Sequence, residues 1–159
     1  MTQQFKEFSI RKGTLADLDI VMRHRRQMFI DMGYRDESAL AATQTTSKPF
    51  FAERMKNQTY HAWFVEDAAR NVVAGGGVVI FDYHSNPTDP LPKRPMVVNV
   101  YTEPSFRRRG IARALMNVIV DWCREYGFGT IILHASDEGR PLYESLGFMP
   151  TGEMRLLLH

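Results

Sequence analysis

The residues of this sequence whose types and spacing favour anion binding are gathered in one segment, 102–115 (TEPSFRRRGIARAL). The segment joins a predicted strand directly to a predicted helix. Backbone N–H groups in the first turn of a helix have no partner within the helix, and the helix dipole adds partial positive charge there, so this end suits phosphate oxygens. Three arginines, 107–109, add charge, and Gly110 and Ala112 leave room for a phosphate to approach the backbone. The segment therefore predicts a phosphate-binding turn.

Other anion-binding classes fit this turn less well. A P-loop needs Gly-Lys-Ser/Thr and a dinucleotide fingerprint needs three spaced glycines, and the turn has neither, so nucleotide hydrolysis is disfavoured. The three arginines leave a nucleic-acid patch open, but no second basic stretch with interleaved aromatic residues accompanies them. Twenty Lys and Arg against eighteen Asp and Glu give a formal net charge of +2. This balance is too even to attract nucleic acid or an anionic membrane, and we expect neither as a partner.

Two motifs of the sequence resemble those of a known family. Arg107-x-x-Gly110-x-Ala112 follows a predicted strand and Pro104. It is similar to the Q/R-x-x-G-x-G/A loop that holds the acyl-CoA pyrophosphate in the GNAT superfamily of N-acetyltransferases. Farther along, 143–148 (YESLGF) resembles the Y-x-x-x-G-F signature that the superfamily carries near its C-terminus. The order of predicted elements is also similar over essentially the whole chain.

The resemblance implies a GNAT-like (acyl-CoA N-acyltransferase) fold and an activity. An N-acetyltransferase of this kind moves the acetyl group of acetyl-CoA to a primary amine of a small molecule or peptide, by direct attack on the thioester and without a covalent enzyme intermediate. A non-catalytic module of the same fold that binds or senses acyl-CoA is the alternative. The residues that the resemblance implies for the cofactor are Val100, Tyr101 and Thr102 beside the pantetheine arm, Arg107, Arg108, Arg109, Gly110, Ile111 and Ala112 at the pyrophosphate, and Ser136, which stands near a family Asn.

Tyr143 matches the family tyrosine that lies near the thioester sulfur and protonates the leaving CoA thiolate. A phenol with an ordinary pKa of about 10 stays protonated at neutral pH and can donate that proton. Packing beside Leu142 and Leu146 is the alternative role. The resemblance leaves the general base open, because some relatives use a glutamate early in the strand before the loop, where this sequence has Met96 and Val97.

Four side chains are candidates for the general base, with a bound water chain as a fifth. Histidine has an ordinary pKa of about 6.5, which suits proton transfer, and His134 is predicted at the end of a parallel strand, beside the cleft where neighbouring strands diverge. A strand histidine also serves as a packed core residue. The candidates are Asn99, Glu103, His134 and His84.

The acceptor pocket of this superfamily is shaped by the first two helices and their connection. The resemblance therefore implies an apolar and aromatic wall made of Phe29, Met32 and Tyr34, with core packing as the alternative for each. The segment 82–95 carries four prolines and reads as a loop. A long loop in a compact domain is typical of a pocket wall or lid, and a surface insertion is the alternative.

The elements that must position these residues alternate between strand and helix patterns. A strand, a helix and a strand at this spacing predict a right-handed βαβ unit with parallel strands, so the fold class is α/β with a mixed, mostly antiparallel central sheet flanked by helices. Glycines 75–77 interrupt an apolar run and predict a bulge or a close backbone approach. The predicted strands are one over Phe5, Phe8 and Ile10, then 61–66, 72–81, 96–102, 130–135 and 148–158, and the predicted helices are 14–33, 37–56, 111–126 and 140–146.

Composition bounds the remaining properties. The chain has 159 residues, 44% of them hydrophobic and 24% charged, which predicts one globular domain over 1–159. A single cysteine, Cys123, and an N-terminus without a long apolar stretch predict a cytoplasmic protein. The five histidines show no metal-ligand spacing, so no metal site is expected. A homodimer formed through edge strands or the C-terminal strand is an open expectation.

Overall fold

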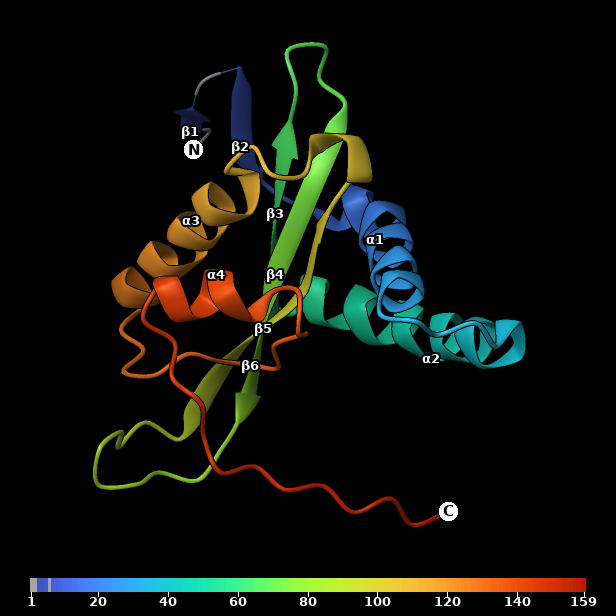
Figure 1. Cartoon of the computed structure of the whole chain (residues 1–159). Helices are drawn as coiled ribbons and strands as arrows, with labels where there is room; N and C mark the ends of the chain where they lie inside the picture. Colours follow the sequence, from blue (N-terminus) through green and yellow to red (C-terminus); the bar gives the residue numbers. More distant parts are fainter. Residues whose placement is uncertain (1–2, 6) are drawn as a thin grey trace.

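The computed structural model describes residues 3–5 and 7–159, which form one mixed α/β sheet structure (Figure 1). The sheet order is β1-β2-β3-β4-β5-β6, and every described pair is antiparallel except the parallel pair β5 and β6. This confirms the predicted fold class. The strands are β1 (Gln3–Phe5), β2 (Phe8–Lys12), β3 (Tyr60–Glu66), β4 (Val72–Asp82), β5 (Lys93–Thr102) and β6 (Ile132–Leu133), and the helices are α1 (Leu18–Asp31), α2 (Glu37–Lys56), α3 (Ile111–Tyr126) and α4 (Arg140–Ser145), with 3-10 turns at Leu15–Asp17 and Pro104–Phe106.

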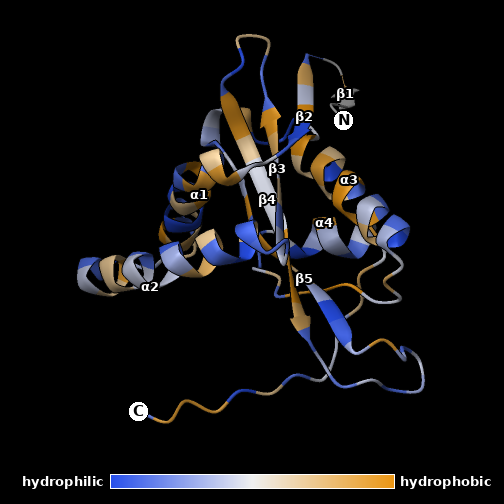
Figure 2. Cartoon of the chain, turned by 180° about the vertical axis from the view of Figure 1, so that it is seen from behind, coloured by the Kyte–Doolittle hydropathy of each residue, from blue (hydrophilic) through white to orange (hydrophobic). Residues whose placement is uncertain are grey.

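The helices cover the sheet from two sides. Figure 1 shows α3 and α4 on one side and α1 and α2 on the other, and Figure 2 shows hydrophobic residues along the central strands between these layers. Leu115, Met116 and Ile119 of α3 are fully buried against the sheet because they recur at helical spacing. On the opposite side, Val21 of α1 and Phe51 of α2 are buried in a second cluster.

The glycines of β4 produce the bulge and close approaches that the sequence predicts. A Cβ atom at Gly75 would lie 2.9 Å from Nδ1 of His24, and one at Gly76 would lie 3.2 Å from Val100. The register between β4 and β5 shifts here, so Gly76 faces two residues, Asn99 and Val100. Asn99 has a φ of 60°, a conformation that Asn tolerates better than most residues.

β5 and β6 diverge after a very short ladder. Met96 pairs with Ile132 and Val97 pairs with Leu133, and no further pair joins these two strands within the described residues. The strand predicted over 130–135 is therefore shorter than expected. Beyond Val97, the edge of β5 that faces β6 has no neighbouring strand, so its backbone polar groups are open to another partner.

Two predicted segments differ in the structure. The strand predicted over 148–158 is wrong, because these residues carry no strand assignment and all of them after the half-buried Phe148 lie exposed; Met154 is 95% accessible. A strand needs a ladder partner and a buried face, and this segment has neither within the described chain. Phe5 and Ile10, predicted on one strand, lie on the antiparallel strands β1 and β2.

The proline-rich connection between β4 and β5 spans residues 83–92 and lies at the end of β5 opposite the predicted phosphate-binding turn (Figure 1). A buried ion pair between Asp89 and Arg94 anchors it. Asn86 also accepts the N–H groups of Thr88 and Asp89, each at 3.0 Å. None of the helices in the described residues has the length and hydrophobicity that crossing a membrane requires.

The start of α1 is fixed by the carboxylate of Asp17. Asp17 accepts the N–H of Thr14 at 2.8 Å and pairs with Arg11 of β2 at 2.8 Å. Arg11 also binds Glu66 of β3 at 2.5 Å. The hydrogen bond from Arg11 lowers the pKa of the buried Asp17 carboxyl below its usual value. This group therefore joins the first helix to the sheet.

The Asp17→Asn substitution is expected to lower the free energy of unfolding by about 3 kcal/mol at pH 7, because it leaves a half-buried guanidinium without one of its carboxylates. The folded-state pKa of Asp17 lies below its unfolded value of about 3.9, so this contribution is complete above that pH and is lost as pH falls through the folded pKa. Urea unfolding of both proteins at pH 7 and in acid measures it.

Asp19→Asn is the matched control for that substitution. Asp19 is exposed and pairs with exposed Lys48 at 3.1 Å, so its loss is expected to cost under about 1 kcal/mol. Equal costs for the two variants, or a difference between wild type and Asp17→Asn that does not narrow in acid, would contradict the assignment.

Candidate active site

The predicted phosphate-binding turn leads from the end of β5 into α3. Gly110 precedes the helix with a φ of 80°, and Arg108 has a φ of 63°. No side chain caps this helix. Within the described residues, the backbone N–H groups from Arg108 to Ala112 donate no hydrogen bond, and the first intrahelical one runs from Ala114 to the carbonyl of Gly110 at 3.1 Å. The turn therefore presents a row of free donors.

The arginine side chains of the turn brace it. Arg107 donates to the carbonyl of Thr102 at 2.9 Å and to Asp31 of α1 at 2.5 Å, and its own N–H donates to Pro104 at 3.3 Å. Arg109 donates to the carbonyl of Ser105 at 3.2 Å, and Arg108 is exposed. The side chain of Arg107 therefore holds the turn in place, while the backbone donors that follow it stay free.

The turn fits a pyrophosphate. A Cβ atom at Gly110 would meet no atom within 4 Å, so the space beside the free N–H groups is open. Consecutive N–H groups around residues of positive φ, at the positive end of a 16-residue helix, make a concave anion site. Ile111 and Ala112 supply two of these donors from the first turn of α3. The residues present therefore match a phosphate group in charge and in shape.

The strand residues predicted beside the cofactor lie on the open part of β5. Val100 contacts the position of Gly76, and Thr102 is tied to Arg107 through its carbonyl. Tyr101 is buried, with its ring centroid 5.1 Å from that of His24. All three follow Val97, where the ladder with β6 ends.

The structure brings Tyr143 and Ser136 together at α4. A Cβ atom at Gly139 would lie 3.0 Å from Cε2 of Tyr143 and 3.2 Å from Oγ of Ser136. Ser136 accepts the N–H of Gly139 at 3.1 Å. Burial raises the pKa of Tyr143, so its hydroxyl stays protonated at neutral pH. Its ring also meets Phe148 of the same motif, edge to face, at 6.0 Å.

The candidate bases lie in different surroundings. His134 is 57% exposed and lies 2.9 Å from Glu153. His84 stacks on Tyr83 in the connection between β4 and β5. Glu103 pairs with Arg23 of α1 at 2.5 Å. The structure does not gather these groups into one cluster.

Asn99 is buried at the bulge of β5. Its Oδ1 accepts from Arg25 at 3.0 Å, and its Nδ2 donates to the hydroxyl of Tyr60 at 3.1 Å. An amide with both ends engaged positions its neighbours. It has no basic lone pair for taking up a proton.

The residues predicted as an acceptor wall lie at the end of α1. Phe29 and Tyr34 meet edge to face at 5.7 Å, while Met32 is 50% and Tyr34 57% exposed. Exposure of this size excludes core packing as the role of Met32 and Tyr34. These two residues are free to contact a ligand.

The sequence analysis did not identify His24 and Arg25 as candidate site residues. His24 is 1% exposed, and burial together with Arg23 lowers its pKa to about 4, so it is neutral at pH 7. Arg25 reaches Asn99 of β5. The signal was present in the spacing, since Arg25 stands four residues from both the apolar Val21 and Phe29 and so shares their face of the helix.

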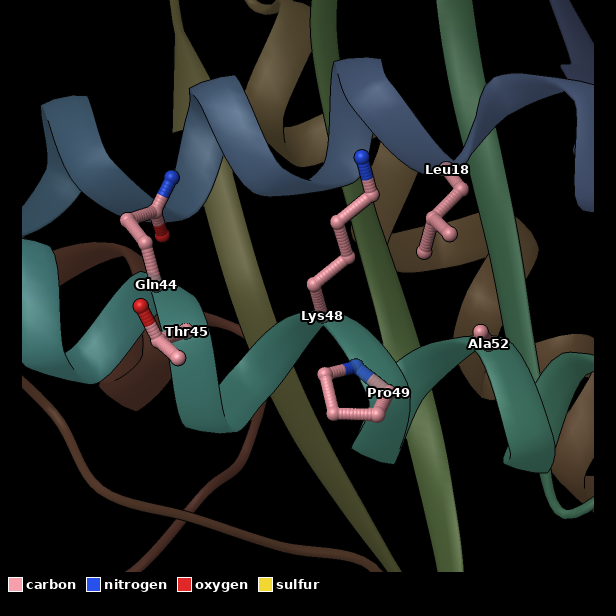
Figure 3. A pocket seen from close by; sticks show the side chains of 6 residues that line it. All are labelled: Leu18, Gln44, Thr45, Lys48, Pro49 and Ala52. Atoms are coloured by element: carbon pink, nitrogen blue, oxygen red, sulfur yellow. The ribbon is translucent and has the colours of Figure 1, made fainter.

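Figure 3 shows a groove between α1 and α2 that holds none of the predicted site residues. Gln44 donates to the carbonyl of Met22 at 3.1 Å across it. Lys48 points toward α1 and pairs with Asp19. The side chains of this groove therefore serve the packing of the two helices. A second pocket, lined in part by His134, Glu153 and Tyr83, lies beside β6.

Comparison with known proteins gives the family. Residues 22–148, more than half of the chain, match the model of the Acetyltransferase (GNAT) family. A GCN5-related N-acetyltransferase from Ralstonia eutropha JMP134 superposes with a TM-score of 0.90 at 36% identity, over 95% of this chain and 98% of that one.

Two further relatives agree. A predicted acetyltransferase from Clostridium acetobutylicum, solved with acetyl-CoA, has a TM-score of 0.86 at 25% identity, over 94% of this chain and 95% of that one. The uncharacterized N-acetyltransferase YjgM of Escherichia coli K12 is 26% identical over 87% of this chain and 80% of its own length. With the free donors before α3 and the tyrosine of α4 in the expected order, the chain belongs to the GNAT acetyltransferase family and is an acyltransferase.

Proposed function

We propose that this protein transfers the acetyl group of acetyl-CoA to a primary amine of a small molecule or peptide. The row of free backbone N–H groups from Arg108 to Ala112, beside the open space at Gly110, is the observation that carries the proposal. The similar Clostridium protein, which was solved with acetyl-CoA, supports the choice of donor. In the proposed arrangement, the pyrophosphate of acetyl-CoA lies at Gly110, its pantetheine arm follows the open edge of β5 from Val100 to Thr102, and its thioester lies toward Tyr143.

Acetyl-CoA supplies an activated acyl group as a thioester. In the proposed direct attack, the amine nitrogen forms a bond to the acyl carbon, the carbon–sulfur bond breaks, the amine loses one proton and the CoA sulfur gains one. The hydroxyl of Tyr143, kept protonated by burial, is the proposed donor to the sulfur.

The amine proton needs an acceptor. We assign this role to His134, which is exposed and is oriented by Glu153 at 2.9 Å. A chain of water molecules is the other candidate. Asn99 holds the strand bulge and the hydroxyl of Tyr60 in position beside the proposed site.

A non-catalytic acyl-CoA-binding module is the second candidate function. The burial of Tyr143 beside Leu146 and Phe148 favours it in one respect, since packing alone can account for that side chain. The two candidates share the cofactor turn and differ only in turnover.

Gly110→Asp is expected to weaken acetyl-CoA binding at least about tenfold, because it places a negative charge and a strained φ of 80° beside the free N–H groups. Calorimetric titration with acetyl-CoA measures the dissociation constant. Gly127→Asp is the matched control, since Gly127 has a φ of 97° and equally open space at the other end of α3. Equal losses in both folded variants, or none in Gly110→Asp, would remove the pyrophosphate from this turn.

Tyr143→Phe is expected to lower kcat about 100-fold while the dissociation constant of acetyl-CoA stays unchanged, because only the proton donor is lost. Release of CoA in the presence of a panel of amines measures turnover. Tyr126→Phe, at an exposed tyrosine stacked on Phe128, is the control and should keep full activity. A wild-type protein that binds acetyl-CoA but turns over no amine would favour the binding module, and full activity of Tyr143→Phe would refute the role of the hydroxyl.

A further inference from the structure

α1 carries three arginines, Arg23, Arg25 and Arg26, and they differ in how their charge is balanced. Arg23 pairs with Glu103 at 2.5 Å, and Arg26 pairs with Glu37 at 2.7 Å. Arg25 has no carboxylate partner among the residues that the structure describes. The middle arginine is therefore the one whose charge the protein leaves unbalanced.

Neutral groups on three elements hold the guanidinium of Arg25. Its Nη1 donates to Oδ1 of Asn99 on β5 at 3.0 Å, and its Nε donates to Oγ of Ser47 on α2 at 3.3 Å. Its Cζ lies 4.8 Å from the ring centroid of Phe29 and 5.3 Å from that of Phe51. The guanidinium is fixed in one orientation by these contacts.

None of these neighbours supplies a negative charge. Asn99 and Ser47 are neutral, and burial raises the pKa of the adjacent Tyr60 to about 12, so its phenol is neutral as well. Burial also lowers the pKa of Arg25 itself. A half-buried cation without a counter-charge is unfavourable, because neutral hydrogen bonds and aromatic rings replace only part of its lost hydration.

The guanidinium keeps donors for a further partner. Its Nη2 makes no hydrogen bond within the described residues, and one proton of Nη1 is also free. Paired N–H groups of a guanidinium match the two oxygens of a carboxylate. The chemistry missing at this position is therefore that of a carboxylate.

Arg25 also lies next to the proposed acetyl-CoA strand. Its partner Asn99 is the bulged residue of β5, and the following residue, Val100, begins the segment proposed to meet the pantetheine arm. Phe29, which the ring contact ties to Arg25, belongs to the expected acceptor wall. A group bound at Arg25 would thus be held on the α1 and α2 side of this strand (Figure 1).

We propose that Arg25 binds a carboxylate of the acceptor, so that the amine acetylated by this protein carries a carboxylate, as an amino acid does. This inference rests on the proposed function and names its substrate class. Arg25 is a specificity-determining residue in this scheme: it contacts the part of the acceptor that does not react, and it orients the amine. Its loss should act on KM for the acceptor more than on kcat.

The test compares acceptors that differ only in the carboxylate. The standard amino acids and their C-terminal amides serve as acceptors for the wild type, Arg25→Gln, Arg25→Lys and the control Arg26→Gln, whose arginine is already paired with Glu37. The wild type and Arg26→Gln should prefer at least one amino acid over its amide about tenfold or more in kcat/KM. Arg25→Gln should lose this preference through KM, and Arg25→Lys should retain part of it because the charge remains.

Several results would overturn the inference. They are equal use of amino acids and amides by the wild type, acetylation of simple amines alone, or a preference that survives in folded Arg25→Gln. Loss of thermal stability in that variant with an unchanged preference would show that Arg25 only joins α1, α2 and β5.

Two further measurements separate this inference from the proposed function. Titration with acetyl-CoA tests cofactor binding, which Arg25→Gln should leave intact; failure of the wild type to bind it refutes the proposed function. Titration with the N-acetyl form of whichever standard amino acid the wild type prefers, and with the amide of that product, tests the Arg25 site without turnover. Binding of the acid over the amide by the wild type, lost in Arg25→Gln, supports the inference, and its absence overturns it.

Discussion

Glycines 75–77, in the middle of β4, form a strip on which neighbouring residues pack so closely that no side chain would fit. Residues from both sides of the sheet contact this glycine strip. The ring of Tyr60 fills the space beside Gly77, where a Cβ would lie 2.6 Å from the ring, and His24 approaches Gly75. Val100 of the neighbouring strand β5 packs against Gly76. Any side chain on this strip would push β3, β5 or α1 away. The bulge at Asn99, the position of Arg25 and the open edge of β5 all depend on this close packing.

Ion pairs set how α1 meets the turn before α3. Asp31 at the end of α1 holds Arg107, and Arg23 in its middle holds Glu103, so the two sides of the 3-10 turn Pro104–Phe106 are fastened to one helix. Each pair is partly exposed and contributes little free energy by itself. These ion pairs act mainly by fixing orientation, because they hold the free N–H groups in a set position relative to the side of the sheet where Arg25 lies.

Much of the fold, and the position of the turn that joins β5 to α3, could be predicted from the sequence, because both depend on local sequence patterns. The helix over 37–56 has the predicted bounds, and the start of α3 after Gly110 follows from a glycine with positive φ. The strand over 148–158 could not be excluded in this way, since both ends of the segment are apolar and only the missing ladder partner decides against a strand. Arg25 was not identified because it stands in the basic run His-Arg-Arg, which suggests a solvent-exposed helix face. Only its position along the helix, four residues from Val21 and Phe29, indicates that it faces inward.

The site residues depend on tertiary context to different degrees. Tyr143 and Ser136 meet because Gly139 lets them approach, which no spacing rule contains. His134 is exposed because β6 ends at Leu133, one residue before it, so the strand end that suggested a base also removes it from the sheet. The residues proposed to act on the acceptor can therefore be identified only from tertiary packing, whereas the proposed phosphate-binding turn can be identified from the sequence.

Among the described residues, only two pairs join β5 to β6, so the part of the chain that follows β6 is joined to the sheet less firmly than the central strands are joined to one another. Residues 134–159 join the sheet through that ladder and the apolar contacts of Tyr143, Leu146 and Phe148, whereas β3, β4 and β5 are bonded along most of their length. We therefore expect the C-terminal part to open at a lower free energy than β3, β4 and β5. Because Tyr143 belongs to this part, a ligand bound against Tyr143 would stabilise its closed state by the free energy of binding. The resistance of residues 134–159 to local opening would then report how much of the protein carries the ligand.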